Sequence, residues 1–146
     1  VLAPLGRWSD MSTVKAANLQ NTGSGAPAFK NSSGTEIGQL CKAWVNFNGT
    51  GTVAIRDNFN VSSITDNGTG DYTVTFANAM ANVNYAVAGA CRFGSNNNAD
   101  IMRVMSVNSA GTLANAMQAS SVRVNTCFQN GGEEDVQMVS VVIFGG

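Results

Sequence analysis

The sequence predicts an all-β protein, an antiparallel β-sandwich or jelly-roll-like knob with an extended N-terminal arm. Three observations favour this fold. From residue 42 onward, apolar and polar residues alternate in short runs, which is the period of a half-buried strand. Turn signals separate these runs and leave about eight strands at a spacing typical of sandwiches. Charged residues make up 12% of the 146 residues, about half the usual share of ~25%, and Gly, Asn, Ser and Thr replace them.

The first forty residues differ from the rest, and we predict two parts: an arm or linker over residues 1–40 and a knob over residues 41–146. The stretch NLQNTGSGAPAFKNSSGTEIGQL, residues 18–40, shows no sustained period of 2 or 3.6. Only residues 12–19 have a pattern that permits a short helix. Such a segment buries too little apolar surface to be ordered alone, so we expect another chain or domain to order it.

The first predicted strand is KAWVNF, residues 42–47, whose alternation puts Val45 and Phe47 on one face. Asn48 to Gly51 then turn the chain. The stretch TVAIRDNF, residues 52–59, continues the alternation, with Val53 and Ile55 on one face and Arg56 and Asn58 on the other.

The stretch ITDNGTGDYTVTF, residues 64–76, raises two alternatives, a cation-binding loop or the turn of a hairpin. Calcium loops place oxygen ligands at set spacings, and here Gly68 and Gly70 stand at ligand positions. Asn-Gly between two alternating runs is a strong hairpin signal. We therefore predict a turn, in which Asp66 and Asp71 accept hydrogen bonds from turn amides. The strand after it has an aromatic inner face and a threonine outer face.

Three later runs continue the pattern, at residues 85–91, 101–107 and 122–128. The alanines and glycine of the first run suggest close packing by a neighbouring layer. Arg123 lies in mid-strand, out of phase with its apolar neighbours. Residues 109–119 leave two alternatives open, a strand or a helical turn.

The end of the sequence, VQMVSVVIFGG, is apolar on both faces of the strand that it predicts. A strand of this kind is either central in a sheet or lies at a subunit interface. The candidate interface residues are Val136, Met138, Val139, Val141, Val142, Ile143 and Phe144.

Composition excludes several functional classes. Histidine is absent, which removes the commonest general base, the Ser-His and Cys-His nucleophile pairs and most zinc sites. The three cysteines are widely spaced and odd in number, which favours buried thiols and a reducing cytoplasm over a disulfide framework. The net charge of −1 and the lack of a basic stripe argue against nucleic acid. A membrane span would need about eighteen consecutive apolar residues, which the chain lacks.

Several polar side chains are candidates for ligand binding. The loop Asn96, Asn97, Asn98, Ala99 and Asp100 offers amide donors and acceptors that match sugar hydroxyls, although Asn-rich loops are also ordinary turns. The acidic run at residues 133–135 predicts a solvated loop tip, because a glycosidase needs two carboxylates across a cleft.

Two aromatic residues have two interpretations. Trp44 and Tyr85 could stack on sugar rings, but aromatic residues of this kind more often lie in a core or an interface. We predict no catalytic residue, no metal site and no cofactor.

The segment from Cys41 to Gly89 resembles one that recurs in bacteriophage tail-fibre and related virion structural proteins. The matching pieces are KAWVNFNGTGTVAIR, FNVSSITDNGTGDYTV and the Ala-Met-x₄-Tyr-Ala-Val pattern that begins at Ala79. The resemblance covers about a third of the chain and is most specific over residues 42–74. Ala81 departs from the pattern, because a proline commonly follows the Ala-Met pair.

The resemblance implies a non-enzymatic virion component, assembled in the bacterial host cytoplasm, that forms a homotrimer at the distal, receptor-binding part of a tail fibre. It implies contact with other virion proteins through the arm, with a host-surface polysaccharide as a candidate ligand. Two alternatives stay open: a capsid decoration protein and a free carbohydrate-binding module.

Overall fold

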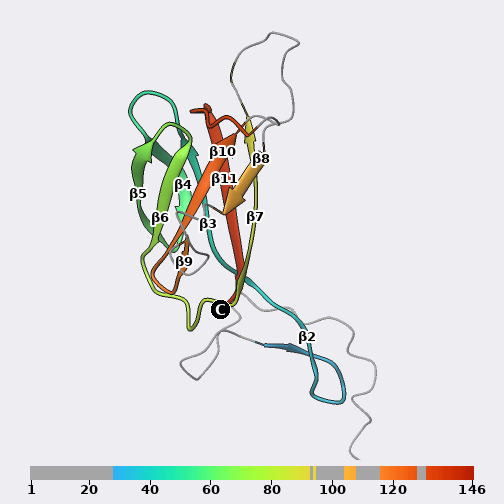
Figure 1. The fold of residues 1–146 in the computed structure, drawn as a ribbon. Helices are drawn as coiled ribbons and strands as arrows, with labels where there is room; N and C mark the ends of the chain where they lie inside the picture. Colours follow the sequence, from blue (N-terminus) through green and yellow to red (C-terminus); the bar gives the residue numbers. More distant parts are fainter. Residues whose placement is uncertain (1–27, 93, 95–103, 108–115, 128–130) are drawn as a thin grey trace, which may run out of the picture. The chain divides into compact units, whose positions relative to one another are not determined.

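The computed structural model describes residues 28–92, 94, 104–107, 116–127 and 131–146 (Figure 1). The chain divides into two compact units, residues 1–38 and residues 39–146. Within the described ranges, no helix has the length and apolar character needed to cross a membrane.

The described part of the first unit holds a small antiparallel hairpin of β1 (Phe29–Lys30) and β2 (Glu36–Gly38). The side chain of Asn31 closes its turn: Oδ1 accepts hydrogen bonds from the amides of Ser33 (3.1 Å) and Thr35 (2.9 Å). This hairpin was not expected in the arm. The helix that the sequence permits over residues 12–19 lies outside the described residues.

The second unit is built from antiparallel strands in two sheets, which confirms the predicted all-β sandwich class. The four-stranded sheet has the order β4-β3-β11-β7, and the five-stranded sheet has the order β5-β6-β10-β8 with β9 beside β10 (Figure 1). The strands are β3 (Cys41–Asn48), β4 (Ala54–Phe59), β5 (Val61–Gly68), β6 (Asp71–Phe76), β7 (Tyr85–Arg92), β8 (Val104–Val107), β9 (Met117–Gln118), β10 (Ser121–Cys127) and β11 (Met138–Gly145).

The core lies between the two sheets and follows the predicted alternation. On β3, Val45 and Phe47 are buried, and on β6 the inner face is Tyr72, Val74 and Phe76. Aromatic rings join the layers edge to face: Phe47 meets Tyr72 with ring centroids 5.1 Å apart. Such pairs stabilise a core beyond the area that they bury.

Asn60 is the corner at which the chain leaves one sheet for the other. It is the single residue between β4 and β5, and its φ of 56° is a left-handed conformation that asparagine tolerates. Its Nδ2 donates to the carbonyl oxygens of Lys42 (3.0 Å) and Asn78 (3.1 Å), and its Oδ1 accepts from the Asn78 amide (2.7 Å). These bonds hold the corner against β3 and the end of β6.

The last strand, β11, is central in its sheet, between β3 and β7. Within the chain it is buried on one face only. Val139, Val141 and Ile143 point into the core, whereas Val142 is half-buried and Phe144 is 40% exposed on the outer face.

Candidate functional site

The predicted turn between β5 and β6 is a hairpin turn, and the described residues contain no group of metal-ligating side chains. Asp66 Oδ1 accepts from the amide of Gly68 at 3.0 Å, as predicted for a turn. The positive φ angles fall on Gly68 (138°) and Gly70 (67°), and not on Asn67 as a simple Asn-Gly turn would have it.

Asp71 accepts from the side-chain amide of Asn67 in the turn (3.3 Å), and it also binds an arginine on the neighbouring strand. Arg123 on β10 donates to it through Nε (2.8 Å) and Nη2, which makes a two-pronged ion pair between neighbouring strands. The hydrogen bond to Asp71 raises the pKa of Arg123. The mid-strand arginine therefore holds β10 to β6, and its charge is already satisfied within the fold.

The acidic run at residues 133–135 is only in part the solvated tip that the sequence predicts, because Glu133 is exposed and the next two residues are half-buried. Asp135 is half-buried and accepts from the amide of Gly70 (2.7 Å) and the hydroxyl of Tyr72 (2.9 Å). Glu133 accepts from the side-chain amide of Asn125. The carboxylates thus act as structural acceptors, because the loop that carries them folds back over the β5–β6 turn.

Tyr72 connects this polar cluster to the core. Its hydroxyl also approaches the carbonyl oxygen of Gly49 at 2.9 Å, and its ring is fully buried. Burial raises the pKa of the Tyr72 phenol, and the hydrogen bond to Asp135 acts in the same direction. The group stays a neutral donor at physiological pH, and its environment is that of a structural residue.

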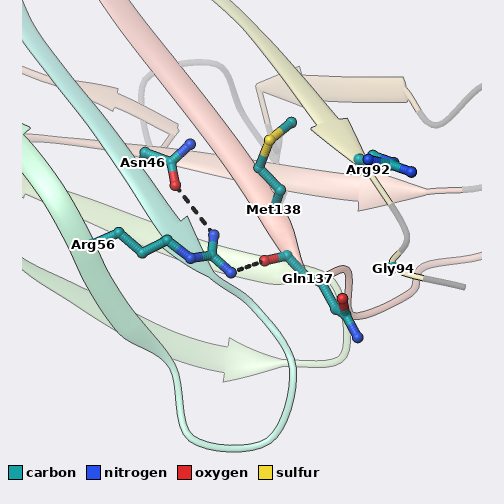
Figure 2. Close-up of a pocket in the computed structure, with 6 residues that line it drawn as sticks. All are labelled: Asn46, Arg56, Arg92, Gly94, Gln137 and Met138. Carbon is teal, nitrogen blue, oxygen red and sulfur yellow. Dashed lines mark hydrogen bonds between the residues drawn. The ribbon is translucent and has the colours of Figure 1, made fainter.

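A pocket of about 420 Å³ lies on the outer face of the four-stranded sheet. We call it the Arg56–Arg92 pocket. Its lining residues come from β3, β4, β7, β11 and the segments that flank β7 and β11. They are Asn46, Arg56, Arg92, Gly94, Gln137 and Met138 (Figure 2).

Arg56 forms a fixed wall of the pocket. It is the extra residue of a β-bulge, because Asn46 pairs with Asp57 and Phe47 pairs with Ile55. Its guanidinium donates to Asn46 Oδ1 (3.1 Å) and to the carbonyl oxygen of Gln137 (Figure 2). It also donates to the carbonyl oxygen of Phe47 (3.0 Å). These bonds orient Asn46 and tie the start of β11 to β3.

Arg92 forms the opposite wall. It ends β7 and faces Met138 in the sheet register, so Met138 lies between the two arginines (Figure 2). Its side chain is exposed and makes no hydrogen bond or ion pair with the residues that the structure describes. The pocket therefore combines amide groups, one anchored guanidinium and one guanidinium with open donors.

The predicted ligand residues Asn96, Asn97, Asn98 and Asp100 lie outside the described residues. Gly94, two residues before Asn96 in sequence, lines the pocket. Sequence reasoning did not select Arg56, Arg92 or Gln137. The alternation of the sequence predicts only that Arg56 and Ile55 lie on opposite faces of their strand. The pocket also depends on contacts between residues far apart in sequence, such as Arg56 and Gln137, which the alternation does not predict.

The candidate interface residues divide between two environments. Val136, Val139, Val141 and Ile143 lie in the core of the chain, so they are not available to a second subunit. On the outer side are Met138, Val142 and Phe144, of which Met138 also lines the pocket.

Tyr85 and Trp44, the two candidates for stacking on sugar rings, lie in different environments. Tyr85 is a core residue, 5% exposed, with its hydroxyl bonded to the carbonyl oxygens of Gln118 and Ser121. Trp44 is half-buried and stands on the outer face, two residues from Asn46 on the same strand.

Comparison with known proteins gives a likeness of fold. No protein-family model matches the chain, and no curated protein matches its sequence. Among solved structures, the chain is similar to the phiAB6 tailspike, whose crystal structure is in complex with three-repeated oligosaccharides of Acinetobacter baumannii surface polysaccharide. The TM-score is 0.52 at 11% sequence identity, over 92% of this chain and 31% of the tailspike chain. This chain thus spans less than a third of the tailspike, and at this identity the likeness is one of fold.

Proposed function

We propose that this chain is a structural component of a phage virion, a distal tail-fibre part that binds a host-surface glycan as a homotrimer. The observation that carries the proposal is the fold shared over 92% of the chain with a tailspike crystallised with surface oligosaccharides. The tail-fibre-like segment over residues 42–74 supports the same conclusion independently, because it rests on sequence and not on fold.

The Arg56–Arg92 pocket supports the glycan part of the proposal. Sugar hydroxyls both donate and accept hydrogen bonds, and the side-chain amide of Gln137 can meet both roles. Asn46 Nδ2 donates to Ser140 Oγ and its Oδ1 accepts from Arg56, so Asn46 offers a ligand its second donor and second acceptor position. Specific small-molecule sites place a few polar groups in a concave surface, as this pocket does.

The outer face of the four-stranded sheet supports the assembly part. Register aligns Phe59, Trp44, Val142 and Ala88 in one row across the sheet. Phe59 is 54% exposed, and the alanines of β7 are exposed as well. The sequence predicts a neighbouring layer over these alanines, and a second subunit would supply it. Contact through the arm with other virion proteins is part of the same proposal.

The proposed role is non-enzymatic. The chain contains no histidine, and the carboxylates of Glu133 and Asp135 are engaged in bonds to Asn125, Gly70 and Tyr72. The six described residues that line the pocket include none with a carboxyl group. The chemistry available there is recognition by hydrogen bonds and charge.

A glycan array of bacterial surface polysaccharides tests the glycan part. The chain of residues 1–146 is expected to bind a subset of polysaccharides, and Asn46→Ala is expected to weaken that binding. The matched control is Asn67→Ala, which lies at the β5–β6 turn of the five-stranded sheet and should leave polysaccharide binding unchanged. A blank array with folded protein would contradict glycan binding.

A further inference from the structure

The charge of the Arg56–Arg92 pocket bears on the kind of glycan that it takes. Among the described residues, those that line the pocket carry two positive charges and no negative charge. In the strand register, the carboxylate nearest to the pocket residue Asn46 is that of its partner Asp57. Asp57 accepts from the backbone amide of Asn58, and among the described residues it forms no ion pair with Arg56. The pocket is therefore a positive site in a chain whose net charge is −1.

The two arginines have different roles. A guanidinium has five N–H donors in a rigid fork. Arg56 uses donors on both terminal nitrogens for Asn46, Phe47 and Gln137, so its main task is to hold the pocket's shape. Arg92 is exposed and has no hydrogen-bond or ion-pair partner among the described residues, so we assign its donors to the ligand.

An open arginine fork favours an anion with two or more oxygens. Carboxylate, phosphate and sulfate groups each accept two parallel N–H bonds, and such charge-assisted bonds are about twice as strong as neutral ones. The attraction is confined to one pocket of a weakly acidic chain, so the pocket engages one anionic group of a polysaccharide at a time. One anionic group per pocket is the arrangement that the charges match.

We propose that the pocket recognises a sugar unit bearing an anionic substituent. The anionic group binds Arg92, and the hydroxyls bind the amides of Asn46 and Gln137. This inference rests on the proposed glycan function and deepens it by assigning the ligand's charge. Carboxylate, sulfate and phosphate share this chemistry, and the test separates them.

The test uses an array with four sets of bacterial polysaccharides: neutral, uronic-acid-bearing, sulfated and phosphorylated. Each bound uronic polysaccharide is also tested after chemical reduction of its carboxyl groups to alcohols, which removes the charge and keeps the sugar. The proteins are the wild-type chain, Arg92→Gln, Arg92→Lys and Lys30→Gln. Lys30→Gln is the matched control, because it removes one positive charge from an exposed residue outside the pocket.

We expect binding only to anionic polysaccharides, weakened about tenfold by Arg92→Gln and by carboxyl reduction. Arg92→Lys should retain part of the affinity, and Lys30→Gln should retain all of it. Added salt should weaken binding by the wild type more than by Arg92→Gln. Because Arg92 is exposed and has no partner among the described residues, its variants are expected to fold, which circular dichroism checks.

Two results would overturn the inference. Equal binding of neutral and anionic polysaccharides, with Arg92→Gln unchanged, would remove the charge assignment and leave the glycan function standing. Binding to no polysaccharide at all would remove the glycan function and this inference with it. The set of anionic glycans that binds identifies which substituent the pocket accepts.

Discussion

Gly70 lies in the β5–β6 turn, at the place where this turn meets the end of β10 and the loop before β11. Its φ is 67°, and a Cβ there would stand 2.5 Å from the carbonyl oxygen of Thr126 and 2.6 Å from the amide nitrogen of Glu134. Both neighbours are backbone, so neither can move aside cheaply. The position needs glycine for its conformation and for its lack of a side chain.

Gly70→Ala is therefore expected to destabilise the fold more than Gly51→Ala. Gly51 has a similar φ of 62° but open space around its Cβ position, so the substitution costs only the left-handed strain of about 1–2 kcal/mol. At Gly70 the clash adds roughly another 1–3 kcal/mol. Chemical denaturation of the two variants checks this, and equal losses of stability would show that the backbone contacts relax.

Tyr72→Phe is expected to change how stability depends on alkaline pH. Burial raises the pKa of Tyr72 above its ordinary value of 10.0, so the fold favours the neutral phenol. The stability from this group is fully present below pH 10 and is lost as pH rises from 10 toward the folded-state pKa, because the unfolded chain then ionises first. Tyr72→Phe lacks this ionisation and should lose stability less steeply above pH 10.

Unfolding free energies of both proteins between pH 8 and 12 measure the effect. At neutral pH, Tyr72→Phe should already be less stable by about 1–3 kcal/mol, since the hydroxyl no longer donates toward Asp135 and Gly49. Burial also raises the pKa of Tyr85. Because Tyr85 is present in both proteins, its contribution to the pH dependence cancels when their unfolding free energies are subtracted. Parallel pH curves for the two proteins would contradict the assignment.

At the scale of the strand, β11 shows how one element serves two surfaces. Its inner residues fill the sandwich, and its outer residues stand on the face that carries the pocket. The same substitution should therefore change the free energy of unfolding by different amounts at neighbouring residues of this strand.

Val141→Ala is expected to destabilise the chain by about 2 kcal/mol, because Val141 is 1% exposed and its truncation leaves a cavity. Val142→Ala, one residue on, should cost less than about 1 kcal/mol, since Val142 is half-buried on the outer face of the single chain. Urea denaturation at protein concentrations where the chain is monomeric compares them. The reverse order would mean that the strand is paired one residue out of register.

Sequence reasoning predicted the elements whose alternation is complete. On β3 and β6, every second residue from Ala43 and from Tyr72 is apolar, so the inner face and the hairpin turn follow from the pattern. The β1–β2 hairpin was missed because strands of two and three residues show no period, and a single side chain, Asn31, closes its turn.

The candidate site was less predictable than the strands. A bulge at Arg56 breaks the alternation, and the residues that Arg56 contacts include Gln137, 81 positions away. The acidic run was misjudged for the same reason. Its charge suggested solvent, which is correct for Glu133, but the bonds from Gly70 and Tyr72 to Asp135 depend on how two distant loops meet.

At the scale of the whole molecule, the proposed trimer predicts that Val142→Lys separates the subunits without unfolding them. A charge in the row of Phe59, Trp44 and Ala88 would be buried without a partner in an assembled interface, which is costly. Thr65→Lys adds the same charge to an exposed position on the five-stranded sheet and is the control.

Sedimentation velocity and circular dichroism together check this prediction. The wild type and Thr65→Lys should sediment as trimers, and Val142→Lys as a folded monomer. A wild-type chain that is monomeric at micromolar concentration would contradict the proposed assembly.

The pairing of β3 with β11 also governs when this chain can fold during its synthesis. The strand at residues 41–48 finds one of its two sheet neighbours at residues 138–145, so nearly a hundred residues must leave the ribosome before that ladder can form. Closing so long a loop is entropically costly and slows folding. The five-stranded sheet needs no residue of β11, so it can form in a nascent chain that stops before that strand. The four-stranded sheet, with the pocket on its outer face, is completed only after β11 has emerged.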